Sequence, residues 1–452
     1  MPPTPPDTGA AARGGAIDRA LRVFGDVRAG EGGRALLMFL NIFLLLVAYY
    51  VLKTVREPLI LTTGGAELKS YAAAAQAASL LVYVPAYGWL ASRLPREKLI
   101  VTVVLFFIAC IQFFYFSGVA GAGFVGFAFY VWVGIFSLTM IAQFWSFAND
   151  VYSKPEGDRL FPLIAVGATA GAPLGAALAG RLFDGGVTPW AMLQIASTML
   201  LLHLALYFAM RRRGAPGAVP APEPVGGRTG GFALALQSPY LRLLALLLIL
   251  LNIVNTTGEF ILAGLVTARA DALAAADPAI DRGAFIGAFY GNYFFWVNIA
   301  SVTIQAFIVS RIVKFLGMAG ALFALPVVAL GVYGLALSGA GLAFVRWVKT
   351  AENATDYSVM NTARQMLWLP TSREEKYKAK QAIDTFFVRT GDLLSAGVVY
   401  AGTHFLALRT TGFAAANLVF VAGALVVSAL LLRQYRRVSA EVAREPQAAA
   451  GA

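Results

Sequence analysis

The sequence predicts an all-α membrane protein with twelve transmembrane helices in two six-helix halves. Three observations support this: the composition, a series of long apolar stretches, and the distribution of lysine and arginine. Of the 452 residues, 59% are hydrophobic and 13% are charged, and the mean hydropathy is +0.70. Soluble domains carry roughly 45–50% apolar and about 25% charged residues. One water-exposed domain cannot bury so much apolar surface, whereas a lipid bilayer solvates it.

The apolar stretches are each close to the ~20 residues that a membrane-spanning helix needs. The predicted helix cores are 33–53, 70–92, 99–118, 123–149, 160–181, 189–210, 240–267, 285–312, 317–337, 341–368, 384–406 and 412–433. Their number and order predict six helices in each half of the chain.

One polar segment interrupts this series. Three successive arginines begin at Arg211 and are followed by a stretch rich in proline and glycine, which is typical of a linker. The predicted organisation is an N-terminal arm at 1–32, a first half at 33–210, a linker at 211–239, a second half at 240–437 and a tail at 438–452. The arm has no apolar core followed by a cleavage site, so no signal peptide is expected.

Lysine and arginine are distributed unevenly between the two sides of the predicted membrane. With a cytoplasmic N-terminus, the inside segments hold most of these residues, and the outside segments hold only Lys69, Arg181, Arg269, Arg282 and Arg409. This asymmetry follows the positive-inside rule and predicts that both termini and the linker are cytoplasmic. The net charge of +12 is therefore interpreted as a topology signal, and no nucleic-acid partner is expected.

Two features point to a carrier built from repeated halves. The basic segment Ser92–Lys98 follows the second helix, and Ser310–Lys314 follows the eighth, which is the matching helix of the second half. Parallel halves of this kind are typical of major-facilitator-like transporters. Gly167, Gly171 and Gly175 lie four residues apart, which predicts a helix-packing stripe. Because no Lys-Ser/Thr follows them, they do not form a phosphate-binding loop for ATP hydrolysis.

The tenth predicted helix carries a stripe of polar and charged residues. Arg346, Lys349, Asn353, Asp356 and Arg364 fall within roughly 80° of one another on a helix. A stripe with charges of both signs is too costly to face lipid, so we expect it to face the interior. It is either a substrate or gating surface or a set of ion pairs that fixes this helix to its neighbours.

Other helices also carry polar residues on one face. Helix seven has Asn252, Asn255 and Glu259, and helix one is expected to end with Lys53, Arg56 and Glu57, of which Lys53 and Glu57 are alternatively interfacial anchors. Among these polar positions, cations outnumber carboxylates, and this excess of positive charge favours an anionic substrate such as a phosphorylated compound. No catalytic residue, metal site or cofactor is expected.

Several aromatic residues lie near these polar positions. They either stack on a nucleobase of the substrate or simply pack within the membrane and at its interfaces. They are Tyr49, Tyr50, Trp132, Trp145, Tyr290, Tyr293 and Trp296.

Three blocks of the chain resemble one transporter family. They are Tyr49 to Thr63, Phe144-Trp145-Ser146-Phe147-Ala148-Asn149, and Asp356-Tyr357-Ser358 through Lys376-Tyr377-Lys378-Ala379-Lys380-Gln381-Ala382-Ile383-Asp384. In this order, over about residues 35 to 435, they are similar to the ATP/ADP translocases of plastids and intracellular bacteria. The resemblance implies twelve helices, a major-facilitator-like fold, and exchange of nucleotides without hydrolysis across a bacterial inner membrane.

The resemblance also implies roles for single residues. Arg56 stands where the family has a lysine, Glu259 stands at a family glutamate, and Lys380 matches the lysine of the Lys-Ala-Ala-Ile-Asp block. A further family glutamate would fall near Val133, where this chain has no acid. The chain is thus expected to be a diverged bacterial member.

The leading hypothesis is an alternating-access carrier of nucleotides or related phosphorylated anions. A proton-coupled exporter of another organic solute, with Glu259 or Asp356 titrating, and a non-transporting membrane scaffold are the alternatives. The expected substrate-binding residues are Lys53, Arg56, Glu259, Arg346, Lys349, Asn353, Asp356, Arg364 and Lys380. The sequence leaves the substrate, the coupling, the direction of transport and the oligomeric state open.

Overall fold

The computed structural model describes residues 16–21, 26–212 and 230–450, and every regular element in these ranges is helical. The longer helices are α2 (Gly32–Arg93), α3 (Arg96–Val119), α4 (Val125–Val151), α5 (Lys154–Asp184), α6 (Pro189–Arg212), α8 (Pro239–Ala276), α9 (Arg282–Phe307), α10 (Val309–Leu337), α11 (Leu342–Thr355), α14 (Val388–His404) and α15 (Thr410–Ala450). The short ones are α1 (Ala16–Leu21), α7 (Gly231–Gln237), α12 (Asn361–Leu367) and α13 (Lys380–Ala382).

Eight helices in the described ranges are long and apolar enough to cross a membrane. They include α2, which joins two helices across a kink at Gly64 and Gly65. Gly65 has a φ of +65°, a value that favours glycine because it has no Cβ. The predicted all-helical membrane fold is thus confirmed, and the exact number of spans stays a prediction.

The first predicted helix is longer than expected. Helical backbone continues past residue 53 as far as the kink at Gly64, so the expectation that helix one ends with Lys53, Arg56 and Glu57 is wrong. The reason is that buried apolar residues such as Val55 and Ile60 continue the packed face of this helix between and beyond the charges. The three charged residues therefore lie along the length of this helix, inside the protein, and not at the end of the helix.

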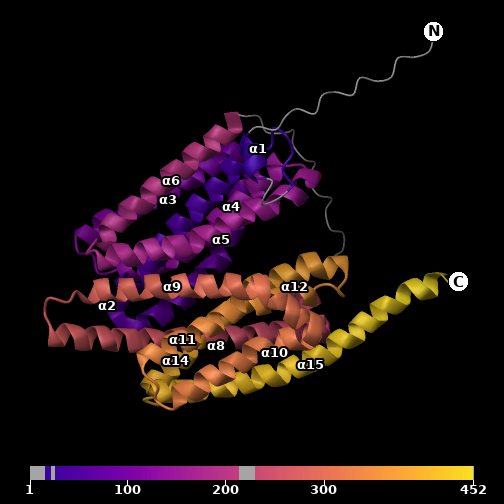
Figure 1. Ribbon diagram of the computed structural model, residues 1–452. Helices are drawn as coiled ribbons and strands as arrows, with labels where there is room; N and C mark the ends of the chain where they lie inside the picture. The colour runs from indigo at the N-terminus through magenta and orange to yellow at the C-terminus, as the bar shows by residue number, and fades with distance from the viewer. Residues whose placement is uncertain (1–15, 22–25, 213–229, 451–452) are drawn as a thin grey trace, which may run out of the picture.

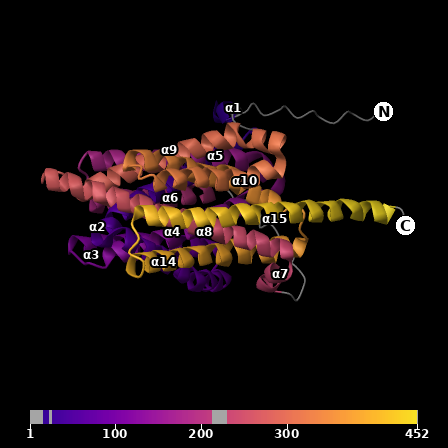
Figure 2. The same cartoon turned by 90° about the horizontal axis from the view of Figure 1, so that it is seen from below.

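The helices form two groups that lie against each other (Figure 1). We call α2–α6 the N-terminal group and α8–α15 the C-terminal group. The groups meet along α5 and α9, where Gly180 and Gly291 bring the two backbones into close approach. Seen from below, α15 runs along α8 and extends beyond the other helices (Figure 2), so residues of the predicted tail up to Ala450 are helical.

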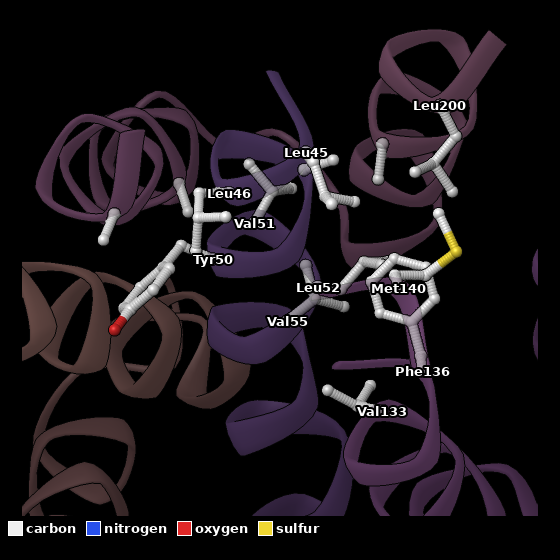
Figure 3. Packing of buried hydrophobic residues seen from close by; sticks show 14 of the residues in the cluster. Leu45, Leu46, Tyr50, Val51, Leu52, Val55, Val133, Phe136, Met140 and Leu200 are labelled. Atoms are coloured by element: carbon white, nitrogen blue, oxygen red, sulfur yellow. The ribbon is translucent and has the colours of Figure 1, made fainter. Parts of the chain in front are cut away.

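The first part of α2 is the central helix of the N-terminal group. Leu52 and Val55 of α2 point toward Phe136 of α4, and Leu200 of α6 lies on the same side (Figure 3). These side chains are fully buried. Val133, near which the resemblance would place an acid, belongs to the same apolar cluster, so a carboxylate there would have no polar partner in this packing.

The glycine stripe of α5 packs against α2, as predicted. A Cβ added at Gly167 or Gly171 would lie 2.6 Å from the carbonyl oxygen of Phe39 or Phe43, and one at Gly175 would lie 2.7 Å from that of Val47. Only glycine permits this backbone approach, which is the small-residue packing typical of membrane helices.

The predicted tenth and eleventh helices are not regular along their length. A π-helical turn at Asp356–Met360 (η1) separates α11 from α12, and two more, at Glu375–Ala379 (η2) and Ile383–Phe387 (η3), precede α14. Turns of this kind occur often at functional sites, because they re-aim side chains and free backbone carbonyls. The helix with the predicted polar stripe is one of the two that carry them.

The glycine stripe gives a stability prediction. Gly171→Ala places a methyl group against the backbone of α2, so we expect a loss of about 1–3 kcal/mol and a lower thermal unfolding temperature in detergent. The control is Gly331→Ala in α10, where an added Cβ meets no atom within 4 Å. That variant is expected to unfold at the wild-type temperature or slightly above, since alanine favours helix over glycine. Equal unfolding temperatures for the two variants would contradict this packing.

Candidate functional site

A polar cavity of about 210 Å³ lies at the junction of the two helix groups. It is smaller than the roughly 300–1,000 Å³ of common ligand pockets, because charged side chains that pair with each other fill much of it. The lining residues are Lys53, Arg56, Glu57, Lys69, Ser70, Ala73, Gln76, Tyr130, Asn252, Asn255, Thr256, Glu259, Phe260, Phe294, Asn353, Tyr357, Arg389 and Asp392.

Four charged residues form a continuous series across this cavity. The Arg56 guanidinium lies 2.7 Å from Glu57 Oε1, Lys69 Nζ lies 2.8 Å from Glu57 Oε2, and Lys69 Nζ lies 3.5 Å from Glu259 Oε2. We call this series, Arg56–Glu57–Lys69–Glu259, the ion chain. Glu57 is fully buried and needs both cations, since an unpaired charge at this depth is costly. Because Glu259 lies on α8, the ion chain joins the two helix groups.

Lys53 is a further cation of the cavity. No described carboxylate lies within ion-pair distance of it, and its ammonium lies 4.4 Å from the Phe294 ring centre and 5.1 Å from that of Tyr50. The lining holds four cations, Lys53, Arg56, Lys69 and Arg389, against three carboxylates, Glu57, Glu259 and Asp392. The cavity therefore has an excess of positive charge, which suits an anion.

Hydrogen bonds fix the acidic groups of the C-terminal group. Asn353 donates to Glu259 Oε1 over 3.1 Å, and Tyr293 donates to the same oxygen over 3.2 Å. On the other wall, Asp392 pairs with Arg389 at 3.2 Å and accepts a hydrogen bond from Asn252 at 2.8 Å. Both carboxylates are thus held in place by neutral neighbours as well as by charges.

The structure brings together four of the nine predicted site residues. Lys53, Arg56, Glu259 and Asn353 line the cavity. The remaining predicted site residues lie elsewhere.

Those five residues have other partners. Arg346 lies against the rings of Phe289 and Trp347 and donates to Asn292. Lys349 is only 2% exposed and donates to Asn255, which lines the cavity. Asp356 and Arg364 line a second, smaller cavity, and Lys380 donates to Gln365 over 2.7 Å.

Sequence reasoning missed the central cation. The charge distribution places Lys69 in an outside segment, whereas in the structure it is 5% exposed and pairs with Glu57 and Glu259. A signal was present, because Lys69, Ala73 and Gln76 recur at helical spacing on one face, and all three line the cavity.

The aromatic residues that line the cavity are also all different from the candidates chosen by sequence. Phe260, Phe294, Tyr130 and Tyr357 line it, and Tyr357 is 44% exposed. Trp132, one of the sequence candidates, instead stacks within the apolar cluster of the N-terminal group. Aromatic type alone does not separate the two environments, because apolar cores and ligand pockets both favour it.

Beyond Lys69, toward the kink at Gly64 and Gly65, α2 and α14 contact each other. His404 Nε2 lies 2.7 Å from Glu67 Oε1, and the rings of Tyr71 and Tyr400 lie 6.4 Å apart. Glu67 also accepts a 2.5 Å hydrogen bond from Tyr71. These contacts lie at the end where α2 reverses at Gly64 and Gly65, opposite the end that carries the chain termini (Figure 1).

Within the described ranges, no group of three or more histidine, cysteine or acidic residues is arranged to hold a metal ion. The backbone carbonyl oxygen of His203 instead accepts a hydrogen bond from the Asn41 side-chain amide on α2, and His203 Nδ1 lies 3.3 Å from the Asn41 carbonyl oxygen. The chemistry of the site is therefore built from ion pairs, amides and aromatic rings.

Solved structures share the fold. The chain resembles the nucleoside transporter NupG with a TM-score of 0.60 at 11% identity, covering 89% of this chain and 99% of that one. It resembles the peptide transporter POT in complex with sulfate with a TM-score of 0.63 at 14% identity, covering 93% and 98%. These likenesses support the predicted major-facilitator-like fold.

Comparison of the sequence finds ATP/ADP transporters among its relatives. Residues 19–119 match the family model of the TLC ATP/ADP transporter. The ADP,ATP carrier protein 1 of Chlamydia trachomatis serovar D is 25% identical, with 83% of this chain and 85% of the relative covered, and that of Chlamydia pneumoniae is 26% identical, covering 72% and 70%. Together these matches show that the chain is similar to ADP,ATP carriers over most of its length, in agreement with the resemblance of its sequence motifs to the ATP/ADP translocases.

Proposed function

We propose that this chain is an alternating-access carrier that exchanges ATP- and ADP-like nucleotides, or closely related phosphorylated anions, across a membrane. The observation that carries the proposal is the ion chain, which spans the two helix groups inside a cavity with an excess of cations. The ADP,ATP carriers to which the chain is similar support nucleotides as the substrate class.

The phosphates of the substrate compete with the carboxylates of the ion chain. Arg56 offers a planar fork of donors to phosphate oxygens, and Lys53 and Lys69 offer point charges. When phosphate replaces Glu259 beside Lys69, the link between the two helix groups is exchanged for contacts with substrate. The groups are then free to rock about the site, which is the motion expected of this fold.

In this proposal the nucleobase of the substrate stacks on aromatic rings of the cavity. Phe294 and Tyr357 present rings to the cavity beside Lys53, so a base stacked there leaves its phosphates near Lys53 and Arg56. Stacking on an aromatic ring contributes about 1–3 kcal/mol per base. It accepts any base, so it supports a nucleotide without selecting adenine.

The other predicted residues act at different points of the cycle in this proposal. Arg346, Lys349, Asp356, Arg364 and Lys380 do not line the cavity in this conformation. We expect them to contact substrate only in other conformations, or to act through residues that do.

The topology belongs to the same proposal. Twelve spans in two halves of six place both termini and the linker in the cytoplasm of a bacterial cell, and the carrier in its inner membrane. The end with the Glu67–His404 contact then faces outward, and in this proposal that contact belongs to an outer gate that is shut in this conformation.

Transport by purified protein tests the site. Proteoliposomes loaded with ADP are expected to take up labelled ATP, and empty ones are not. Arg56→Ala removes a charge-assisted contact worth about 1.5–3 kcal/mol, so we expect the apparent affinity to fall roughly ten- to a hundredfold. Arg56→Lys keeps the charge and is expected to be milder.

Arg93→Ala, which removes an exposed arginine of the same helix, is the control and is expected to transport like the wild type. Thermal unfolding of each variant shows that it is folded. Uptake of an uncharged nucleoside as fast as ATP, and unaffected by Arg56→Ala, would refute the proposal.

A labelling experiment tests the topology. In a Cys110→Ser background, single cysteines are introduced by Ala279→Cys, between α8 and α9, and by Ser372→Cys, between α12 and α14; both positions are exposed. A membrane-impermeant maleimide added to spheroplasts is expected to label residue 279 and to reach residue 372 only after lysis. The opposite pattern would invert the orientation.

A further inference from the structure

We propose that Glu352 is a proton-binding site that couples the charge of the cavity to pH. Glu352 lies on α11, is 2% exposed and does not line the central cavity. Its role in anion transport rests on the proposed function, whereas its titration rests on the geometry alone.

The first observation is the hydroxyl group of Tyr333. This atom lies 3.1 Å from Glu352 Oε1, 3.0 Å from Glu352 Oε2 and 3.1 Å from the carbonyl oxygen of Val254. A tyrosine hydroxyl has one proton to donate and lone pairs that accept. It therefore donates to Glu352 when the carboxylate is ionised. When Glu352 is protonated, the hydroxyl accepts from the carboxylic acid and donates to Val254. Both protonation states are satisfied without any movement of heavy atoms.

The second observation is the environment of Lys349. Its ammonium lies 3.1 Å from Glu352 Oε2, 2.8 Å from Asn255 Oδ1 and 3.2 Å from the Asn255 carbonyl oxygen. When Glu352 takes up a proton, the two Asn255 oxygens still hold the ammonium. The ammonium is itself a cation 3.1 Å from Glu352 Oε2 and would repel a metal cation bound there, so a proton is the ligand that fits.

The third observation is a path for the proton. The second cavity, of about 30 Å³, is lined by Glu352, Asp356 and Arg364. It has room for about one or two waters, since one needs roughly 10–15 Å³ of such space. Asn252 and Asn255 line both this cavity and the central one. Water held in this cavity would carry the proton to Glu352, and the two amides that line both cavities would orient that water.

The groups that face Glu352 from each neighbouring helix define the titration. Lys349 on the same helix favours the carboxylate, as does Arg364 across the second cavity, whereas the carboxylates of Glu259 on α8 and Asp356 favour the protonated form. The Tyr333 hydroxyl on α10 forms a hydrogen bond with either form, and α9 presents Tyr293, whose hydroxyl is hydrogen-bonded to Glu259 and Asn353. On α15 the neighbour is the neutral Asn417, which donates to the Val254 carbonyl oxygen over 3.1 Å, and α14 presents apolar Val388.

The consequence is a link between protons and anions. Protonation forms an O–H bond on Glu352 and removes one negative charge, so Lys349 is no longer neutralised and the positive charge near the cavity rises by one. A substrate with one more negative charge then binds better. By linkage, such a substrate in turn favours proton uptake. Exchange of nucleotides that differ by one phosphate thereby moves less net charge.

Infrared titration of the detergent-solubilised full chain tests the site without transport. The wild type is expected to show a carboxylic-acid C=O band that disappears as pH rises and is absent in Glu352→Gln. Tyr333→Phe is expected to raise the midpoint of this band by about one pH unit, because the hydrogen bond to the carboxylate is the stronger one. Absence of a titrating band that Glu352→Gln removes would overturn the proposal.

Transport tests the coupling. ATP uptake into ADP-loaded proteoliposomes is expected to strengthen at lower pH in the wild type and to lose that dependence in Glu352→Gln. Both proteins meet the same nucleotide at each pH, so titration of the nucleotide cancels. Glu97→Gln, an exposed carboxylate far from both cavities, is expected to keep the wild-type profile.

An unchanged profile in Glu352→Gln would overturn the coupling. A titrating band in a protein that moves no nucleotide would instead refute the proposed function and leave the proton site standing.

Discussion

A charge inside a membrane protein must be paired by another group of the same protein, because lipid offers no partner. This constraint organises the molecule around Glu57, which is fully buried between Arg56 and Lys69. Lys69 continues the series to Glu259 on the other helix group. Removing one partner from a buried pair costs about 3–5 kcal/mol. The two groups are therefore held by charge at the centre of the molecule until an anion from outside takes over one of the contacts.

Backbone geometry places these charges. Gly64 and Gly65 reverse the chain within α2, and the two antiparallel segments bring Glu57 and Lys69 together, although they are twelve positions apart in the sequence. Glycine also opens space in the C-terminal group. A Cβ added at Gly258 would lie 2.9 Å from Lys349 Nζ and would clash with the Tyr333 hydroxyl. The buried Glu352 pair and the central cavity are thus parts of one closely packed polar interior, in which the charge of one group affects the others.

The fold was more predictable from the sequence than the site. Hydropathy and small-residue spacing report on contact with lipid and with neighbouring helices, and these are local properties, so the helix order and the Gly167–Gly175 stripe were predictable. Which charges meet depends on how the two halves dock. Helical periodicity correctly grouped Asn255 with Glu259, but it gave no reason to place Lys69 beside them, and it could not show that Lys349 turns away from the cavity toward Glu352. The π-helical turn at Asp356 also re-aims the stripe that a regular helix would present on one face.

The most direct measurement is the coupling free energy between Lys69 and Glu259, from a double-mutant cycle of unfolding with Lys69→Met and Glu259→Gln. It is taken once without nucleotide and once with saturating ADP. We expect a coupling of about 0.5–3 kcal/mol in the empty protein and a value close to zero with ADP, because phosphate then occupies Lys69. A coupling of the same size under both conditions would show that substrate does not compete with Glu259 for Lys69.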